Sequence, residues 1–511
     1  MSDPVATSSP QGSTWKGWRL FLVSFLVSAV IYGLTTQRGP AWQDSGVFQW
    51  RIHDFDLTGR MGLALAHPLL IVIGKAFSWF PWGPIAWRMN MVSAVFAALA
   101  AASVALLVRR LAPRPAAAAW IAGGFYALAH TVWWLATIVE SQAVHVALFT
   151  ACLHALVSLV RRPQRLMAFL LGLLAGLALM AHNLALLALP AYGLTVIYLC
   201  AKRRLGWSAV GLLIVGWLIG AGGFLAMVVQ KAGEVGVTAS VNSALFGDSW
   251  RSDVLGGSGR AVVMGCGYII YNLPNLALPL MLIGLWSMRR MAGGPLAWAL
   301  GYLVLVYFVF AVRYTVQDQF MFFLPFYALA AVIAGIGLGR LCQAGMRRWL
   351  LWLAAAGVLL TPVIYKAAPH VWQDLRLPLP GREDLPYRSA ARYWLVPWKE
   401  TEDSAGQFAR AAMKSVPPGS IIIADGTAYY PLEWVQRVER ARSDAVILLD
   451  DEATRQKVPE GTPNVFTVSN QPGYVPGWLE CAAEFKPWPD ATRPDSRILY
   501  EIWWRPSASR P

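Results

Sequence analysis

The chain has 511 residues, of which 57% are hydrophobic and only 14% charged, and its mean hydropathy is +0.47. This composition excludes an ordinary soluble protein and predicts a polytopic membrane protein. The net charge of +15 could suggest a nucleic-acid partner, but we expect none, because the basic residues form short clusters between apolar runs, as in membrane proteins.

Apolar runs of about 17 to 25 residues, the length that spans a bilayer, recur along most of the chain. They lie near residues 20–36, 84–108, 116–138, 141–160, 166–181, 183–200, 207–229, 262–288, 296–312, 320–342 and 349–366. The first follows Lys16 and Arg19, and we interpret it as a retained signal anchor. The sequence therefore predicts a mainly α protein, a transmembrane helical bundle of about 11 spans.

Clusters of basic residues separate these runs in pairs. The clusters are Arg109, Arg110 and Arg114; Arg161, Arg162 and Arg165; Lys202, Arg203 and Arg204; Arg289 and Arg290; and Arg347 with Arg348. If each is cytoplasmic, as the positive-inside bias requires, the N-terminus is inside and the C-terminal tail outside. The first loop, 37–82, and the segments 137–142, 182, 231–260 and 313–319 then share the outer side. We expect an integral protein of a bacterial inner membrane whose site faces the periplasm or the exterior.

The composition changes after about His370, where Pro, Arg and acidic residues become frequent and no spanning run remains. This divides the chain into a membrane domain, 1–369, and a soluble extracytoplasmic domain, 370–511. Within the latter, 404–416 and 431–440 read as helices, and 420–424 and 445–449 as buried strands. Their order predicts a small α/β domain. The Gly/Ser-rich segment 231–260 reads as a mobile loop, either a substrate gate or a plain connector.

The first outer loop holds three polar features. Asp44, in the sequence DSG, is either a functional carboxylate near hydrocarbon or the N-cap of a following helix. Asp54 and Asp56, in HDFD, imitate a DxD metal motif, but the match is short, so a divalent metal is conceivable and not predicted. His67 precedes Pro68 at the end of the loop, where it is either a structural residue or a donor to an anionic group.

Two more candidates sit at later turns on the outer side. Glu140 follows Trp133 and Trp134, and the two tryptophans read as an interfacial aromatic belt, which leaves the glutamate unexplained. His182 lies between two apolar runs with almost nothing polar nearby.

A compact polar set, Arg313, Tyr314 and Asp318, occupies the last outer turn of the bundle. The arginine either pairs with Asp318 or faces a phosphate. Gly-rich phosphate loops, Ser-His-Asp elbows and HExxH motifs do not occur in the sequence. Outward-facing carboxylates and cationic groups on an apolar bundle instead fit transfer from a lipid-phosphate donor, with an Asp accepting the proton of the acceptor hydroxyl while Arg and His stabilise the phosphate.

Six motifs, in order, resemble a multi-spanning family, long filed as a domain of unknown function, that includes a eukaryotic protein O-mannosyltransferase. They are the DSG, the His-Pro, the hairpin from Trp133 to Glu140, the His182 turn, RYTVQDQFMFFLP, and ADGTAYYPLEWVQRVERARSDAVIL. The resemblance implies an inverting GT-C type membrane glycosyltransferase with no certain cofactor, which moves a sugar, with mannose as the candidate, from a polyprenyl phosphate to a protein or glycan acceptor. It assigns the base to Asp44 and leaves His67, Glu140, His182, Arg313, Tyr314 and Asp318 as substrate-binding candidates.

The sequence departs from that family in two places. LLIVIG follows His67-Pro68 where the family has a Pro-Gly-Tyr-Pro turn, and Val47 and Phe48 replace an acidic residue. A non-catalytic member of the same fold is therefore one alternative, and a transporter or lipid flippase is another. A third is a scaffold whose tail binds a partner, with Tyr429, Tyr430 and Trp434 suited to sugar stacking.

Overall fold

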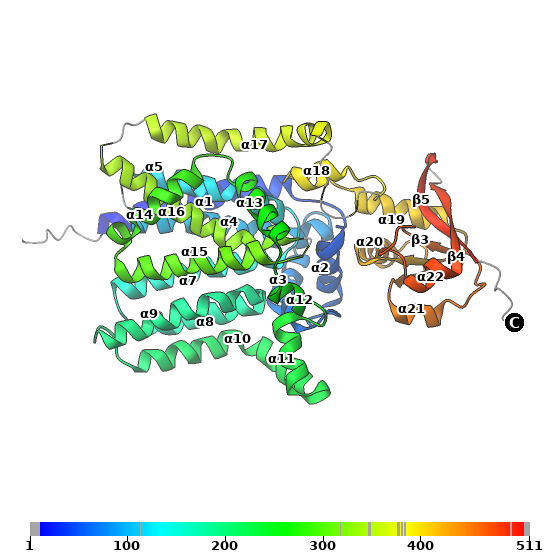
Figure 1. Cartoon of the computed structure of the whole chain (residues 1–511), viewed down its shortest axis with the longest axis horizontal. Coiled ribbons are helices and arrows are strands. Elements are labelled where there is room, and N and C mark those ends of the chain that lie inside the picture. The colour runs from blue at the N-terminus through cyan, green and yellow to red at the C-terminus, as the bar shows by residue number, and fades with distance from the viewer. Residues whose placement is uncertain are drawn as a thin grey trace, which may run out of the picture.

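The computed structural model describes residues 11–112, 114–316, 318–345, 349–375, 379, 382, 385–490 and 493–504. Long helices lie side by side in one bundle, and the strands form a small unit beyond one end of it (Figure 1). The predicted class, a mainly helical membrane bundle with a small C-terminal α/β unit, is confirmed.

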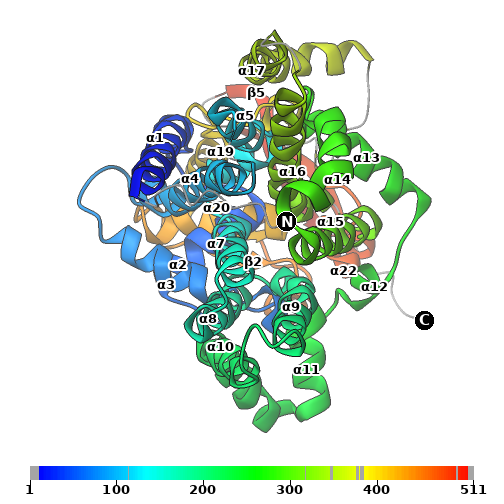
Figure 2. The ribbon, with the colours of Figure 1, turned by 90° about the vertical axis from the view of Figure 1, so that its left-hand side faces the viewer.

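The bundle is built from long helices that Figure 2 shows nearly end-on. They are α1 (Gln11–Thr35), α4 (Ile85–Leu111), α5 (Ala116–Ala127), α7 (Ser141–Arg161), α8 (Arg165–Ala181), α9 (Leu189–Ala201), α10 (Ser208–Val235), α13 (Gly259–Asn272), α14 (Ala277–Ala292), α15 (Gly294–Arg313), α16 (Leu324–Gln343) and α17 (Trp349–Leu375). Shorter elements join them: α2 (Gln43–Asp54), η1 (Leu63–Leu65), α3 (Pro68–Ser78), α6 (His130–Ala136), η2 (Asn183–Ala188), α11 (Val237–Phe246), α12 (Arg251–Leu255) and η3 (Gln319–Phe323).

Eight helices of the described residues are long and apolar enough to cross a membrane, or nine if α13 and α14, which meet at 101°, count as one span. The remaining two predicted runs are shorter helices. Run 116–138 divides into α5 and α6, and run 166–181 forms the 17-residue α8. The prediction of about 11 spans counted apolar residues, which do not reveal where a helix breaks.

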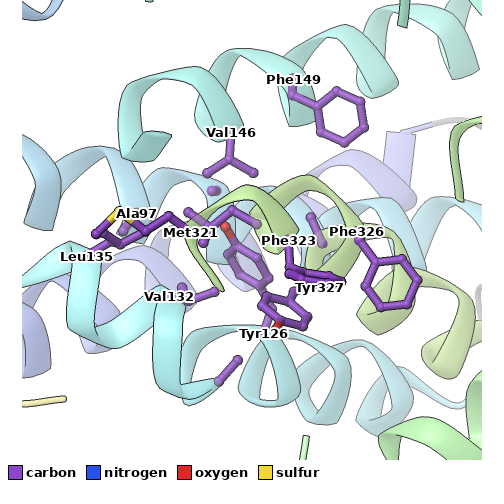
Figure 3. Close-up of a cluster of buried hydrophobic side chains, with 14 of the residues drawn as sticks. Ala97, Tyr126, Val132, Leu135, Val146, Phe149, Met321, Phe323, Phe326 and Tyr327 are labelled. Carbon is purple, nitrogen blue, oxygen red and sulfur yellow. The ribbon is translucent and has the colours of Figure 1, made fainter. Parts of the chain in front are cut away.

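Helix α16 is the centre of the bundle. Every residue from Leu324 to Gly339 is buried, so the helix is apolar all round, as expected of a core helix. Figure 3 shows Phe323, Phe326 and Tyr327 among side chains of the surrounding helices, including Tyr126 and Phe149. The middle of the bundle is packed with side chains at this level.

Two segments predicted as loops contain helices. The first outer loop, 37–82, folds into α2, η1 and α3. The expectation of a Gly/Ser-rich loop over 231–260 is wrong in form, because α10 continues to Val235 and is followed by α11 and α12. Gly236 and Gly247, both with positive φ, supply the bends around α11.

The C-terminal unit has a five-stranded sheet in the order β2-β1-β3-β5-β4, with β2, β1 and β3 parallel and β5 antiparallel to β3 and β4. Its strands are β1 (Ile421–Ala424), β2 (Val446–Leu449), β3 (Val465–Thr467), β4 (Ala483–Asp490) and β5 (Arg493–Trp504). Its helices are α18 (Ala390–Leu395), α19 (Ser404–Ser415), α20 (Gly426–Arg437), α21 (Glu452–Lys457) and α22 (Gly477–Ala482).

The two predicted strands and two predicted helices of this unit are present. Helix α20 starts five residues earlier than predicted, because Asp425 caps it by accepting a hydrogen bond from the Thr427 N–H. Helix α17 continues to Leu375, past the expected domain boundary at His370.

The alternation of helices puts the basic clusters and the polar outer turns at opposite ends of the bundle. Arg109, Arg161 and Arg289 lie in the last turns of their helices, far from the C-terminal unit, whereas α2 and α3 lie beside that unit (Figure 1). The cluster of Arg347 and Arg348 is outside the described residues.

Helices α8 and α10 pack through glycines four residues apart on each helix, Gly172 and Gly176 against Gly216 and Gly220. A Cβ added to Gly220 would collide with the Leu173 carbonyl oxygen, and one added to Gly176 with the Trp217 carbonyl oxygen. Small residues at this spacing let two membrane helices approach backbone to backbone.

Replacing Gly220 by leucine should therefore force α8 and α10 apart and cost about 1–3 kcal/mol, an overpacking penalty. The melting temperature of the protein in detergent measures this. Gly222→Leu is the matched control, since it lies on the same helix and an added Cβ there meets nothing within 4 Å. Equal melting temperatures for the two variants would contradict the close α8–α10 approach.

Candidate functional site

A cavity of about 820 Å³ lies where the bundle meets the C-terminal unit. Most of its wall is formed by the first outer segment, by the turns after α6, α8 and α15, and by helices α11 and α12. Loops of the C-terminal sheet complete the wall. Of the seven candidates from the sequence, six line this one cavity: Asp44, His67, Glu140, His182, Tyr314 and Asp318.

Asp44 sits in the first turn of α2, half-buried in the cavity wall. The N-cap of α2 is Trp42, so the alternative role of Asp44 as the cap is not supported. No hydrogen bond or ion pair to the Asp44 carboxylate is present within the described residues, whereas the neighbouring Asp54 and Asp56 bond to His53 and Arg51 respectively. Burial raises the pKa of Asp44 above its usual value.

A buried amide holds the elements that carry Asp44 and Glu140. The Asn90 Oδ1 accepts hydrogen bonds from Gln49 Nε2 of α2, at 3.1 Å, and from the N–H of Val139, at 3.0 Å. Asn90 Nδ2 donates to the Gln37 carbonyl. Because α2 and the turn before α7 are both bonded to Asn90 on α4, their relative position is fixed by one residue.

Glu140 is buried and accepts a hydrogen bond of 2.7 Å from the Ser45 hydroxyl. Burial is the main cause that raises the pKa of Glu140 well above its usual value, and the charges of Asp44 and Asp318 raise it further. Burial and then Asp44 likewise raise the pKa of Asp318 to about 7. The charges of these three carboxyl groups therefore interact.

His67 is positioned by a buried guanidinium. Arg51 donates to the carbonyls of Asp56 and Leu57 at one end of the loop before α3, and to those of Leu65 and Ala66 at the other. This clamp precedes His67, which has the left-handed backbone conformation (φ 46°, ψ 50°) that a non-glycine residue rarely adopts. The imidazole is thereby turned into the cavity wall beside α3.

The rings of His67 and His182 are stacked, with centroids 4.9 Å apart and planes at 19°. His182 lies at the junction of α8 and η2, and its Nδ1 accepts a hydrogen bond of 3.1 Å from the Leu184 N–H. Next to it the cavity wall is apolar, with Leu184, Leu187 and Phe322.

Arg313 does not line the cavity. Its guanidinium donates to the carbonyls of Val254, Leu255 and Gly256 and so caps the end of α12. The predicted ion pair with Asp318 is absent from the described residues. Tyr314, the next residue, does line the cavity and packs against Phe322, with the two ring centroids 4.4 Å apart.

The prediction of an interfacial belt at Trp133 and Trp134 is wrong, since both side chains are buried. Trp134 lines the cavity and its Nε1 donates to the Tyr393 carbonyl at 3.0 Å, while the Lys399 ammonium lies over its ring. These tryptophans connect the bundle to the segment before α19.

The sequence analysis missed most of the wall from the C-terminal unit, namely Asp425, Thr427, Asp450 and Tyr474; of this wall it had named only Tyr430. Asp425 and Asp450 follow the parallel strands β1 and β2 directly, so they stand at one edge of the sheet. Arg382 pairs with Asp425 at 2.6 Å and stacks on Tyr474. The sequence contained a signal for Asp425 and Asp450, because in IIIAD and VILLDD an acidic residue directly follows a strand pattern.

A metal site is not assembled by the part of the chain that the structure describes, since no group of three or more His, Cys, Asp or Glu side chains there could hold an ion. Asp54 and Asp56, which resemble a DxD metal motif, have different structural roles. Asp56 Oδ1 accepts from the N–H groups of Thr58 and Gly59, which makes it a turn residue, and Asp54 lies beside His53.

Among solved structures, the chain is similar to ArnT from Cupriavidus metallidurans. The apo form matches with a TM-score of 0.58 at 16% identity, over 96% of this chain and 98% of that one. The chain has the GT-C fold of membrane glycosyltransferases. A second structure, ArnT from the same organism bound to undecaprenyl phosphate, matches with a TM-score of 0.57 at 15% identity, over 97% and 98% of the two chains.

Residues 61–205 match the family model described as the protein O-mannosyl-transferase TMEM260 N-terminal domain, which confirms the resemblance predicted from the motifs. The matched segment includes His67, Glu140 and His182 and begins after Asp44. No significant match was found among curated proteins.

The Arg51 clamp can be tested with Arg51→Lys. Lysine keeps the charge but cannot reach four carbonyls at once, so we expect a loss of roughly 2 to 4 kcal/mol. The variant should melt at a lower temperature and be cut faster by protease between Asp56 and Ala66. Arg109→Lys, at the far end of the bundle, is the control and should leave both unchanged. A stable loop in Arg51→Lys would refute the clamp.

Proposed function

We propose that this protein is an inverting glycosyltransferase that moves a sugar, with mannose as the candidate, from a polyprenyl-phosphate donor to a protein or glycan acceptor. Asp44 is the general base. The acceptor oxygen forms a bond to the sugar as the bond between sugar and phosphate breaks, the hydroxyl proton passes to Asp44, and the lipid phosphate leaves.

The observation that carries this proposal is one cavity with two kinds of wall. Leu184, Leu187 and Phe322 supply an apolar face beside the bundle, and the carboxyl groups and tyrosines supply a polar face toward the C-terminal unit. A substrate with a hydrocarbon tail and a polar reacting head fits such a site. The undecaprenyl phosphate bound by the ArnT of the same fold supports a lipid-phosphate donor here.

Asp44 suits the role of base better than the other carboxyl groups of the wall. Asp425 is paired with Arg382, and Glu140 accepts the Ser45 hydroxyl, but Asp44 has no partner among the described residues. A base needs such a free carboxylate within reach of the acceptor hydroxyl. The raised pKa of Asp44 brings it nearer the working pH and makes it a stronger proton acceptor.

The acceptor would approach from the C-terminal unit, which we propose as a distinct extracytoplasmic domain over residues 370–511. Thr427, Tyr430 and Asp450 offer hydroxyl and carboxyl groups at the cavity edge, which suit polar groups of a peptide or glycan. The basic clusters at the opposite end support placing this domain and the cavity on the outer side, the periplasm for a bacterial inner membrane.

The transporter and flippase alternative has less support. Transport needs polar groups along a path through the bundle. The candidate residues gather instead at one end, and the central helix α16 is buried along its length.

Replacing Asp44 by asparagine should lower transfer by about 10²- to 10⁴-fold, because the base is lost while the shape is kept. The assay follows labelled sugar from a polyprenyl-phosphate donor into membrane glycoconjugates. Asp54→Asn is the matched control on the same helix, because Asp54 lies outside the cavity wall, and it should keep full activity. Near-normal transfer by Asp44→Asn would exclude Asp44 as the base.

A further inference from the structure

His67 and His182 place two stacked imidazole rings in one wall of the cavity, and both residues are more than nine-tenths buried. His182 Nδ1 accepts a hydrogen bond of 3.1 Å from the Leu184 N–H, which fixes the tautomer of its neutral ring.

Because Nδ1 is occupied as an acceptor, the neutral His182 ring carries its proton on Nε2, which can donate to a ligand. A neutral His67 ring also has one N–H and one lone pair, and a second proton would convert that lone pair into another donor for an anion beside the two rings.

The surroundings of His67 disfavour a positive charge on its ring. Burial is the main cause that holds the pKa of His67 well below its usual range, and His182, the Arg51 guanidinium of α2 and His145 of α7 lower it further, against the Ala181 carbonyl. The carboxyl groups of Asp44 and Glu140 line the same cavity.

An anionic ligand needs more positive charge than the wall supplies. Six carboxyl groups line the cavity, and Arg60 is the one arginine or lysine among the described lining residues. The N-terminus of α3, which begins directly after His67, adds a partial positive charge at the same place. The remaining source of positive charge at this wall is protonation of the histidine pair.

We propose that His67 and His182 bind the phosphate of the lipid carrier, and that His67 takes up a proton as the phosphate enters. This rests on the proposed function. The apolar wall beside His182, with Leu184 and Phe322, favours a phosphate that carries a hydrocarbon chain over free phosphate.

The proton has a use in the reaction. The donor is a phosphodiester with one negative charge, and its product is a phosphate monoester that carries nearly two at neutral pH, because its second pKa is about 6. The proton of the acceptor hydroxyl goes to Asp44, so the added charge stays on the phosphate. A doubly protonated His67 donates to that oxygen and stabilises the leaving group.

The test measures binding of two probes to the full-length protein in detergent by calorimetry at pH 7.5, in two buffers that differ in ionisation heat. Farnesyl phosphate is the product analogue, and farnesyl methyl phosphate is a diester that has no proton of its own to exchange. We expect uptake of about one proton with either probe, and an affinity that falls by about tenfold per pH unit between pH 7 and 8. Uptake with the diester assigns the proton to the protein.

His67→Gln should abolish the uptake and flatten the pH dependence, since glutamine is polar and of similar size but cannot be protonated. His53→Gln is the control, because His53 is part-exposed, lies beside Asp54 and does not line the cavity. The Asp44→Asn variant should lose transfer and keep the proton uptake, which separates the two proposals.

Binding of the diester by the wild type without proton uptake, or uptake that persists in His67→Gln, would overturn this inference and leave the proposed function standing. The wild-type measurement decides the matter even where His67→Gln fails to fold. Binding of inorganic phosphate as tight as that of farnesyl phosphate would overturn the lipid assignment. Failure of both farnesyl probes to bind at any pH would overturn the phosphate site and the proposed donor class together.

Discussion

One buried guanidinium supports the part of the molecule where the cavity lies. Arg51 lies on α2, about two helical turns beyond Asp44, and it donates hydrogen bonds to both ends of the loop that leads to His67. Gly59, with φ +68°, passes so close to the guanidinium that a side chain there would press on it. Donation to four carbonyls offsets part of the cost of burying this charge, and without it the same carbonyls would be unsatisfied. Asp44 and His67 are therefore linked through one side chain, although Arg51 itself does not line the cavity.

The second constraint is charge. Burial raises the pKa of Asp44, Glu140 and Asp318, and the charge of Asp44 raises the pKa of the other two further. Asp425 is paired with Arg382, which leaves five carboxyl groups of the wall against Arg60, so their full ionisation is opposed by mutual repulsion. An anionic ligand would add to that repulsion, and its binding is therefore expected to depend on pH.

The sequence predicted the bundle and the C-terminal strands, and six of the seven candidate residues that it singled out line one cavity, for one physical reason. Polar groups near hydrocarbon are costly, and the alternation of basic clusters puts every outer turn at the same end. Arg313 lies outside the cavity wall, because periodicity gives its place at the end of α15 but not the direction of its side chain, which turns to the carbonyls of α12. The prediction of an interfacial belt at Trp133 and Trp134 was wrong for a similar reason. Tryptophans at a membrane interface and tryptophans in a buried contact can have the same local sequence.

What the sequence could not reveal is contact between distant segments. Trp42 donates to the Ser404 hydroxyl at 2.7 Å, and Trp134 donates to the Tyr393 carbonyl, so the first outer segment and helix α6 are both bonded to the chain that enters the C-terminal unit. Helix α20 packs directly on α2, where Tyr430 meets Gly46, two residues from Asp44. A Cβ at position 46 would collide with the Ala41 carbonyl oxygen and would also press on Tyr430. The polar wall from the C-terminal unit is therefore packed directly against the helix that carries Asp44, so the two sides of the cavity are held together by close contact.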